Sequence, residues 1–478
     1  MATLSEALLL ALDLHTGGRL DEAEALYDRV LDAVPDQPDA LHLSGILLGQ
    51  TGRLEDGLDR IAKAIAQRPD SAEFHANHGG LLRAAGRMDA AVEAYRLAHA
   101  YGAPDASAVL VELLRDRGAR CLEARDSAGA EAAFAEASRL CPDDAALLAR
   151  VGDARFDQGA WSAAFAAYRA ASLLVPVSFL IHYNLGIAAC NAGDMEAAAT
   201  IFRRACLLKS DHLEAREYLV TALFHGDRRE DAAREAGAIL TRKAREARQS
   251  RPDDAAPPLV VPPSPEGRTR RIISFSLWGS APLYTRGALE NVRLAAEFYP
   301  GWTCRIHHDD SVPASVLEDL AGAGAELVSM EPGSGPTHGL FWRFLVSDDP
   351  TVSHFLCRDA DSRLNSRERA AVDAWIASGL PFHVMRDHIM HTDLMLAGMW
   401  GGRAGVLPPI APLLRAATPS GDGRLRDQRF LARHIWPLIE DRCLVHDSAH
   451  PGHGLPFPDV AIDARFAFTH VGACVKDV

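Results

Sequence analysis

The sequence predicts a multidomain protein, in which an all-α superhelix of repeated helix pairs precedes an α/β domain with a mostly parallel sheet. Three observations support this prediction. A 34-residue pattern recurs through the first half of the chain, a proline-rich segment then interrupts it, and short apolar segments alternate with amphipathic ones beyond it. At 478 residues the chain is also too long for one ordinary domain.

Prolines and small residues mark the repeat. Pro35 and Pro69 lie 34 positions apart, as do Pro142 and Pro176. Glycine recurs where two helices must approach closely, and most repeats carry an aromatic residue on the following helix. We expect these residues to serve packing and not catalysis. The glycines are Gly45, Gly79, Gly118, Gly152 and Gly186, and the aromatic residues are Tyr27, Tyr95, Phe134, Tyr168 and Phe202.

This pattern strongly resembles tetratricopeptide repeats, which are helix-turn-helix units stacked into a superhelix. The resemblance implies about six repeats over residues 4–210, with a break in phase near residues 101–107. A degenerate seventh unit over residues 213–246 has Ala236 at the aromatic position and ends in charged residues, as expected of a solvent-facing cap. We therefore predict a repeat domain over residues 1–249.

The resemblance also implies a groove that binds a peptide or protein partner. Asn77 and Asn184 occupy positions similar to those of the asparagine ladder in O-GlcNAc transferases, but Leu43 and Arg150 interrupt the series. The sequence does not identify the partner.

The segment 250–268 contains six prolines and predicts an extended spacer between domains. Beyond it, we predict an α/β domain over residues 269–478. Strands are expected over 271–278, 303–308, 325–330 and 352–357, and helices over 284–299, 313–323 and 339–346.

The last of these strands leads into Asp359-Ala360-Asp361. Ligands of open α/β sheets bind at the carboxyl ends of the strands, so both carboxylates are placed at that edge. Two carboxylates two residues apart suit a divalent cation with oxygen ligands, and such a cation can hold the phosphates of a nucleotide.

This Asp-x-Asp after α/β units resembles the Rossmann-like GT-A glycosyltransferases, over about residues 270–478. The resemblance implies a nucleotide-sugar donor, with UDP-sugars favoured. Asp359 would contact the ribose or the metal, and Asp361 would ligate Mn²⁺ or Mg²⁺. The alternative is a strand-end turn, in which Asp361 or Ser362 caps the helix that starts near Glu368.

Several neighbours join the predicted nucleotide-sugar site. Arg358 and Arg363 would bind the diphosphate or simply balance the acids, and Trp278 ends the first strand of the domain. Arg343 would reach a phosphate or lie exposed on its helix.

The segment after the Asp-x-Asp is rich in polar and aromatic groups. By the same resemblance, His388, His391 and Trp400 are candidates for the sugar and acceptor pocket. The two histidines, three positions apart, could instead form a metal pair, although the sequence places no third ligand beside them.

Asp427 is the candidate catalytic residue. Many GT-A enzymes carry an acidic residue in this region, and an inverting enzyme needs such a carboxylate as a general base. The alternative is an ordinary helix N-cap.

The C-terminal tail is similar to the His-x-x-Gly-x-x-Lys tail of glycogenin-like transferases. The resemblance implies that His470 is the third metal ligand and that Lys476 contacts the donor phosphate. Here the glycine follows His470 by two positions instead of three. The alternative is a buried strand histidine and a solvated lysine.

Composition excludes some classes of protein. A net charge of −14 argues against general nucleic-acid binding, and the eight scattered cysteines predict free thiols. The N-terminus lacks the basic region of a signal peptide, and no apolar stretch of about 18 residues predicts a membrane span. The expected location is the cytoplasm.

The sequence therefore predicts a metal-dependent, hexosyltransferase-like glycosyltransferase whose repeats bind a partner or acceptor, either a protein or a glycan. Two alternatives stay open. One is an interaction scaffold with a catalytically silent transferase-like domain, and the other is a phosphodiester-processing metalloenzyme that uses the same aspartates.

Overall fold

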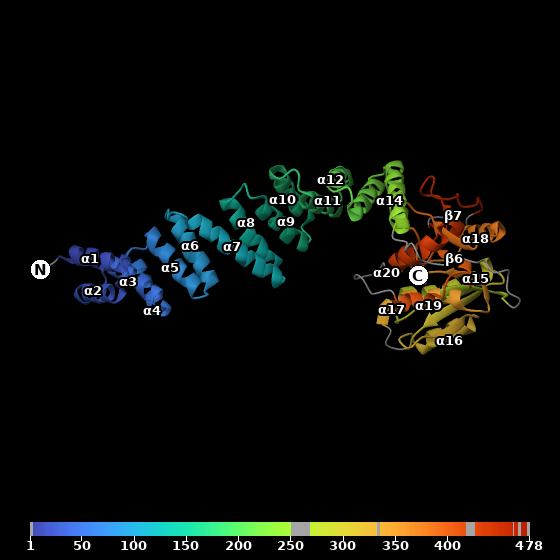
Figure 1. Cartoon of the computed structure of the whole chain (residues 1–478), viewed down its shortest axis with the longest axis horizontal. Helices are drawn as coiled ribbons and strands as arrows, with labels where there is room; N and C mark the ends of the chain where they lie inside the picture. Colours follow the sequence, from blue (N-terminus) through green and yellow to red (C-terminus); the bar gives the residue numbers. More distant parts are fainter. Residues whose placement is uncertain are drawn as a thin grey trace. The chain divides into compact units, whose positions relative to one another are not determined.

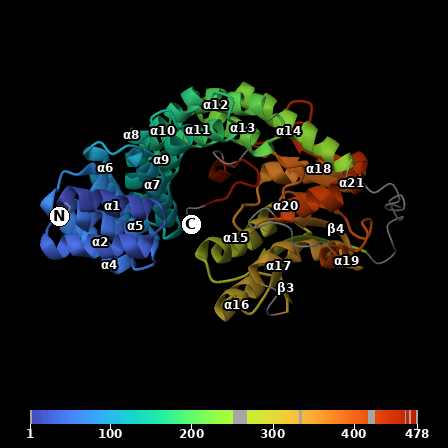
Figure 2. The ribbon, with the colours of Figure 1, turned by 60° about the vertical axis from the view of Figure 1, so that its left-hand side comes forward.

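The computed structural model describes residues 3–249, 268–331, 335–416, 426–461, 463–466 and 470–475. The chain divides into two compact units, Met1–Lys209 and Ser210–Val478. Figures 1 and 2 show their elements, coloured along the sequence. The proline-rich segment lies outside the described residues up to residue 267.

The described part of the first unit consists of six helix pairs, as the repeat pattern predicts. Each helix packs on its neighbours along the chain. The helices are α1 (Leu4–Thr16), α2 (Leu20–Ala33), α3 (Pro38–Gln50), α4 (Leu54–Gln67), α5 (Ala72–Ala84), α6 (Met88–Ala100), α7 (Ala106–Glu123), α8 (Ser127–Leu140), α9 (Ala145–Asp157), α10 (Trp161–Leu174), α11 (Phe179–Asn191) and α12 (Met195–Leu208).

The recurring glycines allow the two helices of a repeat to touch. A Cβ atom at Gly118 would lie 2.6 Å from the ring of Phe134, and one at Gly186 would lie 2.7 Å from the ring of Phe202. Real Cβ atoms do not approach so closely, so a larger residue here would separate the helices. The glycine and aromatic positions therefore have the packing role that the sequence predicts.

The break in phase near residues 101–107 is a longer helix. Helix α7 has 18 residues, whereas α5 and α9 have 13 each. Asp105 precedes α7 with a φ of 60° and marks the irregular turn. The added residues extend one helix without ending the repeat array.

The second unit begins with one more helix pair, α13 (Leu213–His225) and α14 (Arg229–Gln249), and continues into a seven-stranded sheet. Its strands are β1 (Arg270–Leu277), β2 (Thr303–His308), β3 (Glu326–Ser329), β4 (Val352–Cys357), β5 (Phe382–Arg386), β6 (Trp400–Arg403) and β7 (Cys443–Asp447). The helical segments are α15 (Pro282–Phe298), α16 (Ala314–Gly322), α17 (Gly335–Trp342), η1 (Arg343–Asp348), α18 (Ser366–Ser378), α19 (Ile410–Ala416), α20 (Arg426–Phe430), η2 (Leu431–Ile435), α21 (Trp436–Ile439), η3 (Glu440–Arg442) and η4 (Ala464–Phe466).

The sheet has the order β3-β2-β1-β4-β6-β5-β7. Strand β6 is antiparallel to both of its neighbours, and all the other pairs are parallel. The sheet is therefore mixed, although most of it is parallel as predicted. From β1 the chain proceeds outward to β2 and β3, and then returns to the other side of β1 with β4. Such a reversal is a topological switch point, where ligands of α/β sheets bind.

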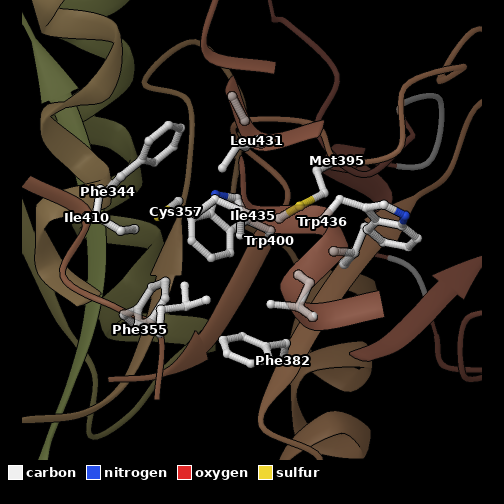
Figure 3. Packing of buried hydrophobic residues seen from close by; sticks show 14 of the residues in the cluster. Phe344, Phe355, Cys357, Phe382, Met395, Trp400, Ile410, Leu431, Ile435 and Trp436 are labelled. Atoms are coloured by element: carbon white, nitrogen blue, oxygen red, sulfur yellow. The ribbon is translucent and has the colours of Figure 1, made fainter. Parts of the chain in front are cut away.

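The main core of the second unit lies around β4, β5 and β6. Trp400 packs against Phe344 and Phe355, with ring centroids 5.7 and 5.1 Å away (Figure 3). Leu240 and Ala247 of α14 belong to the same buried cluster. Helix α14 therefore shares the hydrophobic core of the α/β sheet.

Polar contacts also join α14 to the α/β part of this unit. The Nζ atom of Lys243 donates to Glu217 at 2.8 Å and to Asp393 at 2.7 Å. Arg248 donates to Glu440 at 2.8 Å. The structure thus differs from the expected solvent-facing cap, because α14 has an apolar face in the core and its Lys243 side chain is mostly buried between two carboxylates.

Candidate functional site

Three residues from separate parts of the chain meet beyond the ends of β1 and β4. Arg343, at the start of η1, lies 3.0 Å from the Oδ1 atom of Asp359 and donates to Asp427 at 2.8 Å. Its backbone N–H donates to the Oγ atom of Ser276 on β1. The buried guanidinium therefore links the Asp-x-Asp segment to the candidate catalytic aspartate on α20.

Electrostatic interactions keep the guanidinium of Arg343 charged and shift the pKa of Asp427. Burial lowers the pKa of Arg343, but the charges of Asp359 and Asp427 outweigh that effect and raise it. Burial raises the pKa of the Asp427 carboxyl to about 6, although the charge of Arg343 opposes the shift. Asp427 is therefore ready to exchange a proton near neutral pH.

Asp361 is the second carboxylate of the pair. Burial, and then the charge of Asp359, raise its pKa, as expected of two acids in one site. The alternative role as a helix cap is wrong, because Asn365 caps α18 by accepting from the Glu368 N–H at 2.9 Å. The side chain of Asp361 instead forms a hydrogen bond with Cys474 of the C-terminal tail, which opposes the rise in its pKa.

The carboxylate of Asp359 lies against Gly398. A Cβ atom at this glycine would lie 2.0 Å from Oδ2 of Asp359 and 2.9 Å from its backbone nitrogen. Only glycine fits this position without moving the aspartate.

Asp359 opens into a cavity of about 1090 Å³ within the second unit. Helices α13 and α14 form one wall, and α20 and η2 contribute another. Residues 390–399, here called the cavity loop, supply most of the remainder, and Gly472 of the C-terminal tail also lines the cavity. Charged groups on these walls include Glu217, Lys243, Asp393, Arg429 and Arg433.

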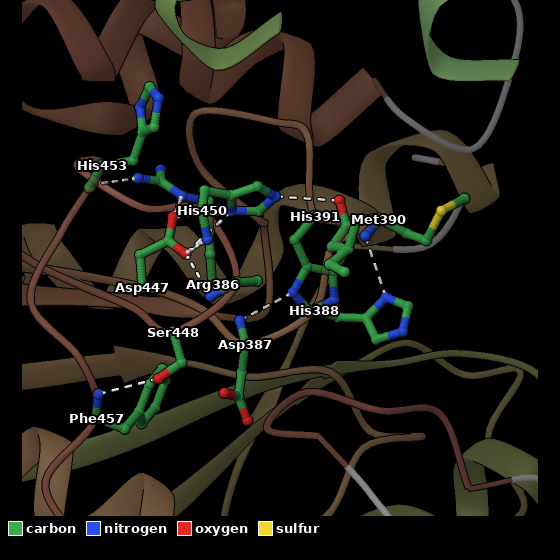
Figure 4. A network of polar contacts seen from close by, with 12 residues as sticks. Arg386, Asp387, His388, Met390, His391, Asp447, Ser448, His450, His453 and Phe457 are labelled. Carbon is green, nitrogen blue, oxygen red and sulfur yellow. Dashed lines mark hydrogen bonds and ion pairs between the residues drawn. The ribbon is translucent and has the colours of Figure 1, made fainter. Parts of the chain in front are cut away.

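A polar network holds the cavity loop in place (Figure 4). Arg386 donates to Asp447 at 2.7 Å and to the Leu394 carbonyl at 2.8 Å. His450 lies 3.0 Å from Asp447, and its other ring nitrogen lies 3.1 Å from the Ile389 carbonyl. Burial raises the pKa of Asp447, but His450 and Arg386 outweigh it and lower that pKa to about 2. The network therefore keeps its charge at neutral pH.

The predicted pocket histidines lie together and are joined by the tail histidine. The ring of His470 is 4.5 Å from that of His388 and 4.8 Å from that of His391. Burial lowers the pKa of His388 to about 4 and lowers that of His391 well below its usual value. His391 lines the cavity, so at neutral pH it presents an uncharged imidazole there.

Three predicted contact residues lie away from the cavity. Arg358 donates to Glu368 at 2.6 Å and to two backbone carbonyls. Arg363 donates to the carbonyl of Ser362 at 2.8 Å. Trp400 has no exposed surface and belongs to the core. All three side chains thus contact other parts of the protein, and none of them lines the cavity.

One further predicted residue, Trp278, lies near the switch point. Trp278, directly after β1, packs edge-on against Trp342 at 6.3 Å. The C-terminal tail reaches the Asp-x-Asp segment, because the Val475 N–H donates to the Asp361 carbonyl at 2.9 Å. Lys476 lies outside the described residues, so its predicted phosphate contact stays a prediction.

The donor set suits a divalent cation in part. Asp359 and Asp427 both pair with the guanidinium of Arg343, and burial, followed by the charge of Asp359, raises the pKa of the Asp361 carboxyl. Mg²⁺ is often held by one or two carboxylates together with phosphates and water. However, no group of three or more metal-binding side chains occurs among the described residues. Asp359 and Asp361 would hold the cation together with phosphate oxygens and water. The ligand role of His470 stays a prediction.

Sequence reasoning left the role of Arg343 open and did not single out Gly398, Arg429 or Arg433 as site residues. Arg343 stands in the run Phe341-Trp342-Arg343-Phe344. An arginine among aromatic residues is a signal of burial, and a buried arginine needs anionic partners. That signal could have linked it to the aspartates.

Comparisons with known proteins support the repeats. Residues 14–78 and 152–211 match family models described as tetratricopeptide repeat. The tetratricopeptide prediction is thus confirmed, and such repeats support a peptide or protein partner. No curated protein matches the chain.

Solved structures resemble the chain only in part. A structure of Naa15/Naa10 bound to HypK-THB is 16% identical, with a TM-score of 0.37, and covers 50% of this chain and 36% of its own. A mutant O-GlcNAc transferase of Thermobaculum terrenum is 18% identical, with a TM-score of 0.27, and covers 53% of this chain and 46% of its own. The tetratricopeptide protein YrrB is 17% identical, with a TM-score of 0.26, and covers 40% of this chain and 95% of its own. With TM-scores this low, the function proposed below rests on the site itself.

Across the described ranges, no helix combines the length and apolar character needed to cross a membrane.

Proposed function

We propose that the protein is a metal-dependent glycosyltransferase that moves a sugar from a nucleotide-diphosphate donor to an acceptor. One observation carries the proposal. Asp359 and Asp361 follow β4 at the switch point of the sheet, and buried Arg343 holds Asp359 at the edge of a large cavity. This is where an α/β sheet binds nucleotides.

The residues divide the chemistry between them. Asp359 and Asp361 would hold the divalent cation, which when bound would supply positive charge to neutralise the departing diphosphate. An acceptor hydroxyl oxygen forms a bond to the anomeric carbon of the donor sugar. At the same time, the bond between that carbon and the diphosphate oxygen breaks. The nucleoside diphosphate leaves, and the hydroxyl proton passes to a base. In an inverting reaction, Asp427 is our candidate for that base.

The acceptor enters the same cavity. Helices α13 and α14 form one of its walls, so the last helix pair contributes directly to the proposed active site. A protein or glycan bound there would present its hydroxyl to the sugar. The repeats of the first unit would bind a peptide or protein partner.

The experiment is a titration of UDP into the full chain with Mn²⁺, comparing the parent with Asp361→Asn. The substitution keeps the shape of the side chain but removes its charge, so metal-dependent binding should fall at least tenfold. Asp319→Asn, at an exposed position on α16, serves as the matched control and should bind as the parent does. If Asp361→Asn also binds UDP and Mn²⁺ like the parent, the metal assignment is wrong.

A catalytically silent scaffold is the second candidate. The observation in its favour is that Asp359 already forms an ion pair with Arg343 at 3.0 Å, which occupies one oxygen that a metal would use. Under this hypothesis the parent chain binds no nucleotide with or without Mn²⁺, while the repeats still bind their partner.

A further inference from the structure

The cavity contains two arginines that no described carboxylate neutralises. Arg429 and Arg433 are both exposed and both line the cavity. None of the described ion pairs includes either guanidinium. Many other arginines of the chain do have such partners, including Arg343, Arg386 and Arg248. Other exposed arginines, such as Arg415, also lack a described ion pair, but Arg429 and Arg433 differ from it because both line the cavity.

Most of the nearby carboxylates already form ion pairs with other cations. Glu217 and Asp393 both pair with Lys243, and Glu246 pairs with Arg242. Asp427, two positions before Arg429, pairs with Arg343. Most of the carboxylates that line the cavity thus pair with other cations. Among the described lining carboxylates, Glu214 has no described ion pair.

The arginines also lie close to each other. They are four positions apart, and neighbours at this spacing share one face of a helix. Like charges there repel by about 0.2–0.5 kcal/mol. Residues 431–435, which include Arg433, form a π-helical turn, and such turns occur frequently at functional sites. An anion bound beside both guanidinium groups would offset this repulsion.

We propose that Arg429 and Arg433 form the site for the diphosphate of the donor. The guanidinium group is planar and its N–H groups match phosphate oxygens in pairs, so two of them suit a diphosphate. Asp359 lines the same cavity, so a diphosphate beside a cation on Asp359 lies in the space that both arginines line. This inference rests on the proposed function.

Arg429 and Arg433 would thus take the diphosphate-binding role that was predicted for Arg358 and Arg363. Arg358 and Arg363 flank the Asp-x-Asp pair in sequence, but both are buried and bonded to protein groups. Arg429 and Arg433 lie some seventy positions further along the chain, yet line the cavity that Asp359 reaches.

The test measures binding of UDP with Mn²⁺, and of inorganic pyrophosphate without metal, to the full chain. The double variant Arg429→Gln/Arg433→Gln should weaken both ligands at least tenfold. Arg415→Gln, an exposed arginine on α19 outside the cavity, is the control and should leave both unchanged. Uridine, which lacks phosphate, should bind the parent and the double variant alike.

The outcomes separate this inference from the proposed function. If UDP binding needs Asp361 but not the two arginines, the arginine site is wrong and the transferase proposal stands. Arginine-dependent binding of pyrophosphate without binding of any nucleotide supports the diphosphate site and contradicts the donor. Arginine-dependent binding of phosphoserine in place of pyrophosphate overturns the inference, because the arginines would then recognise a phosphorylated acceptor.

Discussion

The position of Asp359 depends on a residue that carries no side chain. A Cβ atom at Gly398 would meet both the carboxylate and the backbone nitrogen of Asp359. Rotation of the aspartate side chain cannot relieve a clash that includes the backbone. Gly398 is therefore as important to the site as the aspartate itself.

We expect Gly398→Ala to displace Asp359 and to weaken Mn²⁺-dependent UDP binding at least tenfold, as measured by titration calorimetry. Gly322→Ala is the matched control, because a Cβ atom at Gly322 would meet nothing within 4 Å. Circular dichroism should show both variants folded. Unchanged nucleotide binding in Gly398→Ala would show that Asp359 is not needed where the structure places it.

The raised pKa of Asp427 predicts how the rate of the transfer reaction depends on pH. Burial raises its pKa to about 6, so the carboxylate is protonated below this pH and cannot accept a proton. If it is the general base, the rate should rise as pH increases through about 6. Asp427→Asn should reduce the rate about 100-fold or more and remove this rise.

A positioning role gives a different result. Asparagine retains an oxygen that can accept from Arg343, so Asp427→Asn would then preserve much of the rate and leave its pH profile unchanged. Measurements of initial rate between pH 5 and pH 8, made at saturating donor, distinguish the two roles.

At the residue scale, the sequence identified Asp359, Asp361 and Asp427 separately, from a strand end and from a helix start. It could not show that Arg343 joins Asp359 to Asp427, because that contact depends on how η1 packs against α20. Trp400 was misplaced for a similar reason. Alternation along a short strand does not reveal that both faces of β6 are covered.

At the scale of elements, α14 joins the helix pair α13–α14 to the cavity loop. Lys243 has a side chain only 17% exposed and contacts carboxylates on α13 and on the cavity loop. Removing this charge would leave Glu217 and Asp393 without their partner, and an unpaired group of this kind is costly.

We expect Lys243→Met to destabilise the packing of α14 on the cavity loop by about 2 kcal/mol. Hydrogen exchange of the backbone amides of residues 390–396 should become about 30-fold faster, as measured by mass spectrometry. Arg248→Met removes an ion pair of a more exposed arginine with Glu440 and should cost less than about 1 kcal/mol. Equal effects of the two substitutions would contradict a special role for Lys243.

The order of strands and helices was largely predictable from the sequence. The strand expected over 352–357 is β4, and that expected over 303–308 is β2. Apolar runs bounded by turns carry this information locally. The reversed direction of β6 and the packing of α14 were not predictable, because they depend on contacts between segments far apart in the chain. In α14, the numerous charges also concealed the apolar face that contains Leu240.

At the scale of the whole molecule, the structure and the sequence place the functional boundary differently. The sequence favours a cut inside the proline-rich segment, whereas the compact units divide between Lys209 and Ser210. The difference is the helix pair α13–α14, which resembles a repeat in sequence but shares its core with the sheet. This core contact and the ion pairs of Lys243 would be lost in a fragment that starts at residue 268.

We therefore expect residues 210–478 to fold as a soluble unit that binds UDP and Mn²⁺ as the full chain does. Residues 268–478 should be insoluble, or should melt at least about 10 °C lower, since the loss of several kcal/mol shifts Tm by that amount in a unit of this size. Differential scanning fluorimetry and nucleotide titration of both fragments provide the comparison. A soluble fragment 268–478 with the same Tm and the same affinity would show that α13 and α14 are dispensable. In that case the cavity wall formed by α13 and α14 would have no part in donor binding. The repeat domain would then extend to residue 249, as the sequence predicts.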